Sequence, residues 1–434
     1  MQFFQDLGSL VEQRWREQSY NEEVFPEVAA AALAEMTPGK QVSPWDVIRW
    51  LNTTSQLPEQ RDVQGRFGNP PITLYDGPRF YIDIYYWLDG TTSIHQHAFC
   101  GAFQVLKGSS ILSQYRFEET RRINAHFLAG EVILDSVELL EEGDIRQIFP
   151  GKQYVHSLFH LDRPSVSIII RTNQSPSGLP QYNYLKPSFA VDPFFTNQTM
   201  IKRVQSVSLL LSMKHPDADE IIGDLLSYSD FHTAFSVLDV AFNMLPNDRL
   251  ERAFGLSTGK ERFEALFEIA RRRHGELADL ILPVFEEVRR QQNLIQRRSQ
   301  ITSNEHRFFL ALLLNVSDRT KLLDLVRHRF PERNPVNTIT NWVDELANTK
   351  VAGSSEPNVL GISNYDEDYL FVFQCLLEGL TLEETRAAFE EEFAVKDGDA
   401  SANKAEELCD TVRNSILLSP FLLIPNQPWR RVNQ

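Results

Sequence analysis

The chain has 434 residues, of which 42% are hydrophobic and 24% charged, as in an ordinary globular protein of two or three domains. Its formal net charge of −16 argues against a surface built to bind nucleic acid or an anionic membrane. Three scattered cysteines exclude a disulfide framework, and the first residues lack the basic and apolar regions of a signal peptide. We therefore expect a cytoplasmic protein whose partners are neither nucleic acid nor membrane.

The N-terminal segment, residues 1–60, has the pattern of helices. Leu7, Val11 and Trp15 recur at helical spacing. Further along, Pro44 follows a serine, as expected for an N-cap and the first position of a helix. The pattern predicts a helical lead-in to whatever follows.

Residues 61–198 form a second segment of different character. Short β-branched and aromatic runs alternate with turn sequences such as Asp76-Gly77-Pro78. Many short strands at close, regular spacing indicate a small closed barrel or a sandwich. The predicted strands are 72–75, 79–88, 92–97, 102–106, 110–117, 131–140, 144–148, 155–161 and 165–172.

Residues 199–434 keep a period of 3.6 and are predicted to form a large all-α domain, so the whole fold is α+β. We find no catalytic motif in this part. We expect it to pack against the strands, to cover a pocket mouth or to form a homodimer interface. The predicted helices are 199–213, 217–228, 230–244, 247–255, 259–273, 275–298, 303–315, 318–329, 335–347, 366–379, 382–393 and 403–417, with loops at 349–364 and 396–403.

Three histidines in the strand-rich segment suggest a metal site. His95 and His97 stand one residue apart at the end of a β-patterned run, and residues i and i+2 of a strand face the same way. If the strand bearing His156 lies beside them, three neutral imidazoles converge on one metal ion and leave open coordination positions. Nitrogen donors suit Fe, Ni, Cu or Zn, so the residue types alone do not select the metal.

The spacing of glycines around these histidines resembles the two signature motifs of the cupin superfamily. The matching residues are Gly90, His95, His97 and Gly108 in the first motif, and Gly143, Pro150, Gly151 and His156 in the second. In that superfamily an acid stands four residues after the second histidine and seven before the glycine, and this position is Gly101 here. The carboxylate ligand is therefore missing.

A three-histidine set without the carboxylate resembles the thiol dioxygenases, of which cysteine dioxygenase is the best-known type. The resemblance covers about residues 1–190. It implies a jelly-roll-like cupin β-barrel with N-terminal helices and a ferrous ion, Fe²⁺, held by His95, His97 and His156. It also implies a small-molecule substrate and O₂ as reaction partners.

The chain departs from that family at several positions. Some members carry a cysteine, linked to a tyrosine, where this chain has Gly101; Cys100 is one residue away and faces the other way by strand parity. The tyrosine position is occupied by Arg171, and the substrate-binding arginine has no clean match, with Arg66 and Arg79 the nearest. We therefore do not expect the substrate to be simply cysteine.

Two further residues are candidates for catalysis. His160 shares the parity of His156 and could be an outer hydrogen-bond donor, a proton-transfer group, a fourth ligand or a hydrogen-bonded barrel histidine. Arg171 needs an anion if it is buried. That anion is either a substrate carboxylate or a structural partner such as Glu131 or Asp135.

The leading hypothesis is a mononuclear non-haem iron dioxygenase acting on a small anionic molecule, with thiols as one substrate class. Two alternatives remain open. One is a non-redox cupin isomerase or lyase that uses Zn or Ni as a Lewis acid. The other is a non-enzymatic ligand-binding or interaction protein in which the helical domain is the working part.

Overall fold

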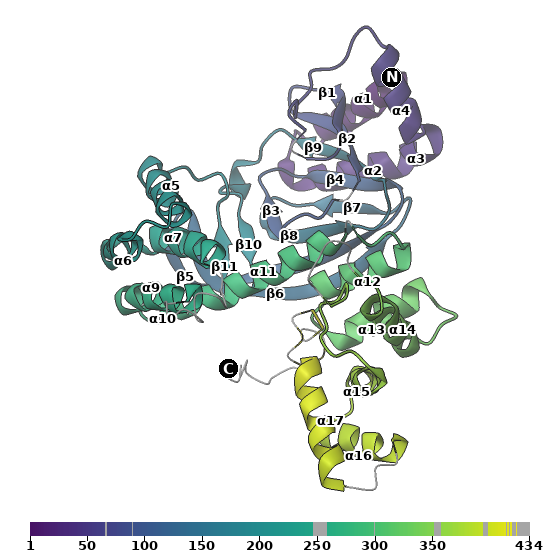
Figure 1. The fold of residues 1–434 in the computed structure, drawn as a ribbon. Coiled ribbons are helices and arrows are strands. Elements are labelled where there is room, and N and C mark those ends of the chain that lie inside the picture. The colour runs from purple at the N-terminus through teal and green to yellow at the C-terminus, as the bar shows by residue number, and fades with distance from the viewer. Residues whose placement is uncertain are drawn as a thin grey trace.

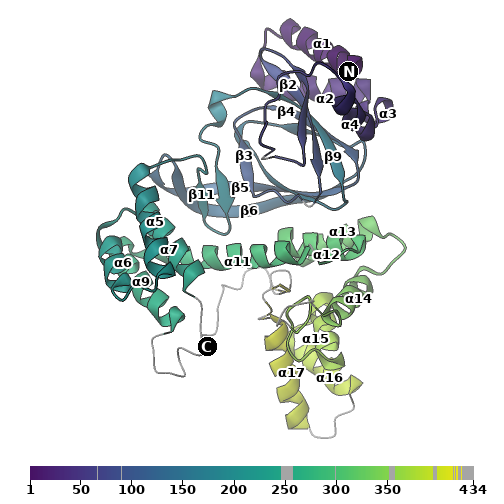
Figure 2. The same ribbon diagram turned by 45° about the horizontal axis from the view of Figure 1, so that its top comes forward.

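The computed structural model describes residues 1–65, 67–88, 90–245, 258–298, 300–350, 357–393 and 398–413, together with Ser415, Leu417, Leu418 and Leu422. The fold is α+β. A five-stranded sheet and a closed six-stranded barrel lie against each other, and helices cover both outer sides (Figures 1 and 2).

The N-terminal helices cover the outer face of the five-stranded sheet (Figure 1). Leu7, Trp15 and Phe25 from these helices share one buried cluster with Ile82 and Ile84 of the sheet. Burial of this apolar surface fixes the helices on the sheet. The elements are α1 (Gln2–Glu17), η1 (Glu22–Val24), α2 (Phe25–Met36), α3 (Pro38–Gln41) and α4 (Pro44–Thr53).

The five-stranded sheet is covered on both faces. In sheet order its strands are β1 (Pro71–Asp76), β2 (Phe80–Trp87), β9 (Ser165–Thr172), β4 (Gly101–Lys107) and β7 (Ile145–Ile148). All eight residues of β2 are buried. Its side chains alternate, so that Ile82 and Ile84 face the helices while Tyr85 and Trp87 face the barrel. We call the space between sheet and barrel the inter-sheet layer; Phe103 and Tyr154 also pack in it.

The six-stranded barrel closes in the order β10 (Asn183–Leu185), β11 (Phe189–Val191), β6 (Phe127–Leu140), β5 (Ser110–Asn124), β8 (Gly151–His160) and β3 (His95–His97). Two predicted strand boundaries are wrong because β5 and β6 stay paired as far as Asn124 and Phe127 and form one long hairpin, and a third is wrong because β8 begins at Gly151 and not at residue 155. The predicted strand 92–97 is reduced to its last three residues. Strands β10 and β11 were not predicted, since three-residue strands give no periodic signal.

The remaining helices form two groups beside the outer face of the barrel, with α11 lying across that face between them (Figures 1 and 2). They are α5 (Gln198–Ser212), α6 (Ala218–Tyr228), α7 (Phe231–Met244), α9 (Gly259–His274), α10 (Glu276–Asp279), α11 (Ile281–Arg298), α12 (Asn304–Asn315), α13 (Arg319–Arg329), α14 (Pro335–Ala347), α15 (Glu367–Glu378), α16 (Leu382–Glu392) and α17 (Gly398–Arg413). The helices after residue 360 pack on other helices and lie away from the barrel. A bilayer crossing needs a longer and more apolar helix than any found within the described residues.

Four predictions for this part differ from the structure or lie wholly or partly outside the described residues. The single helix predicted over 275–298 is interrupted, since α10 ends at Asp279 and α11 begins at Ile281. The loop predicted over 396–403 is wrong over its last six residues, because α17 begins at Gly398. The helix predicted over 247–255 and part of the loop predicted over 349–364 lie outside the described residues.

Candidate metal centre

The structure brings His95, His97 and His156 together, as the sequence predicts. One ring nitrogen from each lies within 4.8 Å of the others, and all three residues are buried. The Nε2 atoms of His97 and His156 are 2.8 Å apart. The three ring centroids are separated by 4.6 to 4.9 Å. Three imidazoles therefore point at one small volume.

Strand pairing explains this convergence. Strands β3 and β8 are antiparallel neighbours, with His95 opposite His156 and His97 opposite Gly151. Because alternate residues of a strand share a face, both histidines of β3 project towards the same side as His156. Phe99 and Tyr154 flank them, with ring centroids 4.3 Å from His97 and 4.6 Å from His156. The centre thus lies in the inter-sheet layer.

The environment keeps all three imidazoles neutral. Burial lowers the pKa of His95, and the hydrogen bond to the Ser93 carbonyl opposes that effect only in part. Burial lowers the pKa of His97 and His156 well below the ordinary value of 6.5, and at His97 the positive charge of Arg171 adds to the effect. A metal-ligating histidine must be neutral, so this environment favours ligation.

The hydrogen-bonding state of the rings also fits a metal ion. The Nδ1 of His95 lies 2.8 Å from the carbonyl oxygen of Ser93, so an N–H there leaves the Nε2 lone pair free. Such an outer hydrogen bond is what orients a ligating imidazole. Within the described residues, Nε2 of His95 and Nδ1 of His156 are buried without a hydrogen-bond partner. Three buried imidazoles, two of them with an unpartnered ring nitrogen, suit a divalent first-row transition metal.

A carboxylate cannot join the three histidines from the position of Gly101. A Cβ placed there would lie 1.9 Å from the carbonyl oxygen of Ile170 and 2.9 Å from Cα of Arg171. This crowding arises because β4 pairs with β9 at Gly101 and Arg171. Glycine at this position is required by the close approach of two backbones.

Arg171 lies beside the histidines at the end of β9. Its guanidinium carbon is 3.3 Å from the ring centroid of Phe99 and 5.2 Å from that of Tyr81. Its charge contributes to the lowered pKa of His97, so the two groups are electrostatically coupled. The Nε atom is buried and lacks a hydrogen-bond partner in the part of the chain that the structure describes.

The predicted structural partners of Arg171 are wrong. Asp135 is exposed on β6 and pairs with Arg116 of the neighbouring strand, and Glu131 is exposed on β6 as well. Neither carboxylate faces the inter-sheet layer. No ion pair of Arg171 is found among the described residues.

His160 lies away from the three histidines. It is four residues after His156, which corresponds to about 13 Å along a strand. Its Nδ1 is 2.9 Å from Oγ of Ser110 and 2.8 Å from Oγ of Ser165, and its ring stacks on Trp87 at 4.4 Å. A cavity of about 10 Å³ beside it has room for about one water molecule. A catalytic role for His160 stays a prediction.

The other sequence candidates lie elsewhere. Arg79 is exposed, with its guanidinium carbon 4.1 Å from the ring centroid of Tyr20, in the N-terminal helical layer. Cys100 packs among the residues under the N-terminal helices, so the prediction that it faces away from the site is confirmed. Arg66 lies outside the described residues.

Sequence reasoning missed Asp83, which is 3% exposed on β2. Its Oδ2 accepts a hydrogen bond of 3.1 Å from the Tyr85 hydroxyl, whereas Oδ1 has no partner in the described residues. Burial raises the pKa of this carboxyl group, while nearby Arg171 lowers it. A lone acid within an otherwise apolar and aromatic strand was the signal that could have identified it.

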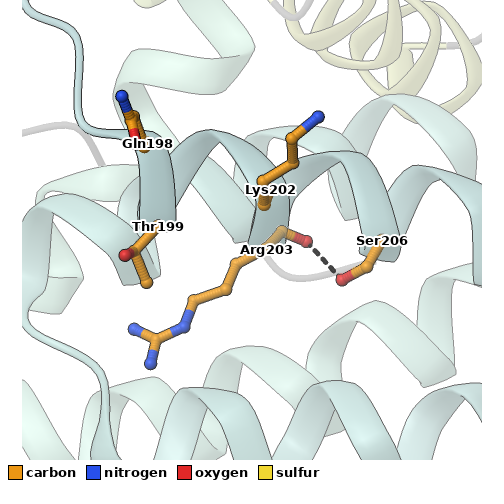
Figure 3. A pocket seen from close by; sticks show the side chains of 5 residues that line it. All are labelled: Gln198, Thr199, Lys202, Arg203 and Ser206. Atoms are coloured by element: carbon orange, nitrogen blue, oxygen red, sulfur yellow. Dashed lines mark hydrogen bonds between the residues drawn. The ribbon is translucent and has the colours of Figure 1, made fainter.

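A larger depression of about 460 Å³ lies on the exposed side of α5 (Figure 3). Its lining residues all come from this helix, and the Ser206 hydroxyl donates to the carbonyl oxygen of Arg203 at 2.7 Å. The depression has no lining residue in common with the histidine centre. We assign it no part in the chemistry of that centre.

Comparison with known proteins gives only partial similarities. No protein-family model and no curated protein matches the chain. Hydroquinone 1,2-dioxygenase from Sphingomonas sp. TTNP3 with 4-hydroxybenzoate bound is 8% identical over 25% of this chain and 68% of its own, with a TM-score of 0.20. CapF with the inhibitor 3-isopropenyl-tropolone is 16% identical over 30% of this chain and 35% of its own, with a TM-score of 0.18. The capsular polysaccharide assembling protein CapF from Staphylococcus aureus is 13% identical over 35% of this chain and 43% of its own, with a TM-score of 0.19. The matched region therefore spans less than half of either CapF chain.

Proposed function

We propose that this protein is a metal-dependent enzyme of the cupin type, and that it acts as a mononuclear non-haem iron dioxygenase on a small anionic molecule. His95, His97 and His156 would hold the ion. The observation that carries the proposal is the convergence of three buried, neutral imidazoles at a place where the backbone excludes a carboxylate. When bound, a ferrous ion with three neutral ligands keeps its full 2+ charge and open positions for an anionic substrate and dioxygen.

The residues around the histidines would prepare the site for an anion. No carboxylate ligand offsets the charge of the ion, and Arg171 adds a positive charge that acts on His97. Phe99 holds the guanidinium on one side, and the aromatic ring of Tyr154 covers His156. An aromatic surround of this kind excludes water and strengthens the attraction between Arg171 and a substrate carboxylate or thiolate.

Elemental analysis of the protein purified without a histidine tag tests the metal. We expect near-stoichiometric iron in the wild type and none in the His95→Ala/His97→Ala double variant. A His306→Ala/His328→Ala double variant is the control, because it removes two imidazoles from helices α12 and α13. Native zinc or nickel would favour the Lewis-acid isomerase or lyase instead. Absence of metal after anaerobic loading with ferrous iron would contradict the proposal.

Oxygen uptake by the iron-loaded protein, screened with thiols and small carboxylic acids, tests the reaction. For an active substrate we expect Arg171→Gln to raise KM by roughly 10- to 100-fold, since one charge-assisted contact is lost. Arg171→Lys should recover part of that loss because it retains the charge. An unchanged KM in Arg171→Gln would exclude Arg171 as the anion-binding group.

A further inference from the structure

The strand that carries two of the three candidate ligands is held by few backbone contacts. Strand β3 has three residues, and its pairs are His95 with His156, His97 with Gly151, and His95 with Asn183 of β10, together with a single bridge from His97 to Pro150. The register between β3 and β8 shifts between His95 and His97. Such a short and irregular ladder fixes the rotation of β3 about its own axis less firmly than a long regular one, so contacts outside the ladder help to set where the two imidazoles point.

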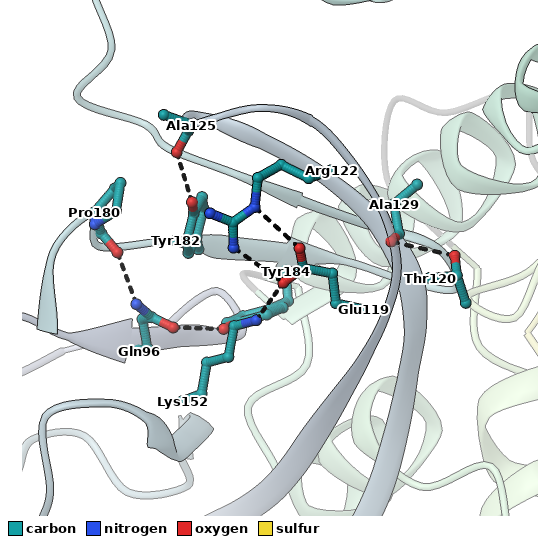
Figure 4. A network of polar contacts seen from close by, with 10 residues as sticks. All are labelled: Gln96, Glu119, Thr120, Arg122, Ala125, Ala129, Lys152, Pro180, Tyr182 and Tyr184. Carbon is teal, nitrogen blue, oxygen red and sulfur yellow. Dashed lines mark hydrogen bonds and ion pairs between the residues drawn. The ribbon is translucent and has the colours of Figure 1, made fainter.

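The side chain of Gln96, between the two histidines, supplies such contacts. By strand alternation it faces away from the imidazoles, and it is 3% exposed. Its Nε2 donates to the carbonyl oxygens of Pro180 at 2.7 Å and Gly178 at 3.3 Å. Its Oε1 accepts a hydrogen bond of 2.5 Å from the hydroxyl of Tyr184, which is also 3% exposed (Figure 4). Both ends of the amide are therefore bonded, and all three partners come from one stretch of chain.

The backbone of the same stretch, residues 175–184, also binds the main chain around β3. The amide of Gln96 donates to the carbonyl of Tyr182 at 3.1 Å, and the amide of Tyr184 donates to the carbonyl of Ile94 at 2.8 Å. Gly178 approaches so closely that a Cβ there would lie 2.5 Å from the carbonyl oxygen of His97. Residues 175–184 therefore form a support along the side of β3 that faces away from the histidines.

We infer that Gln96 is a positioning residue for the three-histidine centre. Its amide ties β3 to Tyr184 and to the carbonyls of residues 178 and 180, and this fixes the rotation that lets His95 and His97 meet His156. A strand turned about its axis would carry both flanking imidazoles in the same direction, away from His156. The inference rests on the proposed function only in assigning a metal ion to the histidines.

Cobalt binding compared across matched variants tests this role. Gln96→Leu keeps the size of the side chain and removes its hydrogen bonds, and Tyr184→Phe removes one bond without touching β3. Gln104→Leu is the control, because Gln104 is also buried in a strand and donates one bond of 3.1 Å to the carbonyl of Gly143. By chelator competition we expect a 10- to 100-fold loss of Co²⁺ affinity in Gln96→Leu, as for other outer contacts of metal ligands. We expect a smaller loss in Tyr184→Phe and a change of less than about twofold in Gln104→Leu.

A second measurement on the metal-free protein separates positioning from general stability and from metal binding. In histidine-labelled protein, the ¹⁵N resonances of His95 and His97 should shift in Gln96→Leu and stay in place in Gln104→Leu, with melting temperature recorded for each. If the wild type binds no cobalt but these resonances shift, the positioning role stands and the proposed function fails. If the resonances and the affinity stay unchanged while Gln96→Leu melts earlier, Gln96 is merely structural and the inference is overturned.

Discussion

At the residue scale, Gly101 decides which ligands the centre can have. Strands β4 and β9 approach so closely there that a Cβ would lie 1.9 Å from the carbonyl oxygen of Ile170. That distance is far below a van der Waals contact. The clashing atom belongs to the backbone, which cannot change rotamer to make room as a side chain could. The packing of β4 against β9, and not only the choice of glycine at position 101, therefore excludes a carboxylate ligand.

We expect Gly101→Ala to lower the free energy of unfolding by roughly 3 kcal/mol, because β4 and β9 must separate to admit one methyl group. Urea unfolding measures this. Gly39→Ala is the matched control: Gly39 is exposed on α3, and a Cβ there would be 3.6 Å from the side chain of Leu106. The control should change stability by less than about 1 kcal/mol. Equal stability of Gly101→Ala and wild type would contradict the close approach.

His160 gives a prediction about pH. Burial, helped by the charge of Arg298, lowers the pKa of His160 from 6.5 to about 3. Between these two values the unfolded chain binds a proton that the folded chain does not. The contribution of His160 to the free energy of unfolding is therefore fully present above the unfolded pKa of about 6.5. As the pH drops below that value, this contribution falls by about 1.4 kcal/mol per pH unit. Urea unfolding of wild type and His160→Asn between about pH 4 and pH 7 should show a shallower dependence in the variant. Parallel curves would contradict the burial of a neutral His160.

At the scale of elements, α11 connects the barrel to the helical half. Arg298, the last residue of α11, is 2% exposed and reaches into the barrel end. Its Nη1 donates to the carbonyl of Gly90 at 2.9 Å and to Oγ1 of Thr91 at 2.8 Å, and its Nη2 donates to the carbonyl of His160. The guanidinium also lies 4.2 Å from the ring centroid of Phe159. A cation at a helix C-terminus is favoured by the helix dipole, so one side chain stabilises both elements.

We expect Arg298→Met to lower the free energy of unfolding by about 3 kcal/mol, since buried carbonyl groups lose charge-assisted hydrogen bonds. Arg327→Met on α13 is the control, because Arg327 is 58% exposed and pairs with Asp324 at the surface. Its effect should stay within about 1 kcal/mol. Chemical unfolding measures both variants, and losses of the same size would show that Arg298 does not connect the two parts.

At the scale of the whole molecule, the barrel and the helices share their buried clusters. Ile111 and Phe159 of the barrel pack in one cluster with Phe308 of α12, and Phe127 and Phe189 pack in another with helices α5, α6, α7, α9, α10 and α11. The apolar outer face of the barrel is therefore buried by the helices, and the apolar inner faces of the helices are buried by the barrel. Without the other part, each of these faces would be exposed to water.

This sharing predicts cooperative unfolding. In scanning calorimetry the barrel and the helical half should unfold in one transition. Residues 1–197 expressed alone should be insoluble or bind a hydrophobic dye, because the apolar outer face of the barrel becomes exposed. Two well-separated transitions, or a soluble fragment that does not bind the dye, would contradict this.

The sequence was sufficient to predict what depends on local periodicity. Parity placed His95 and His97 on one face, and the change from period 2 to period 3.6 near residue 198 separated strands from helices. Contacts between distant parts of the chain were not predictable. Gln96 and Tyr184 are 88 residues apart, and Arg298 and Gly90 are 208 apart. The environment of Arg171 was misjudged for the same reason, since which strands neighbour β9 is a matter of topology.

The close approach of β4 and β9 at Gly101 also limits how the ligand set of the histidine centre can change during evolution. A single base change converts a glycine codon to one for aspartate or glutamate, so an acidic residue at this position lies one step away by mutation. The clash with the backbone of Ile170 would make that step destabilise the fold before any new ligand could be tested by selection. A histidine-only ligand set can thus persist without selection on its chemistry, and regaining a carboxylate first requires a shift of strand β9.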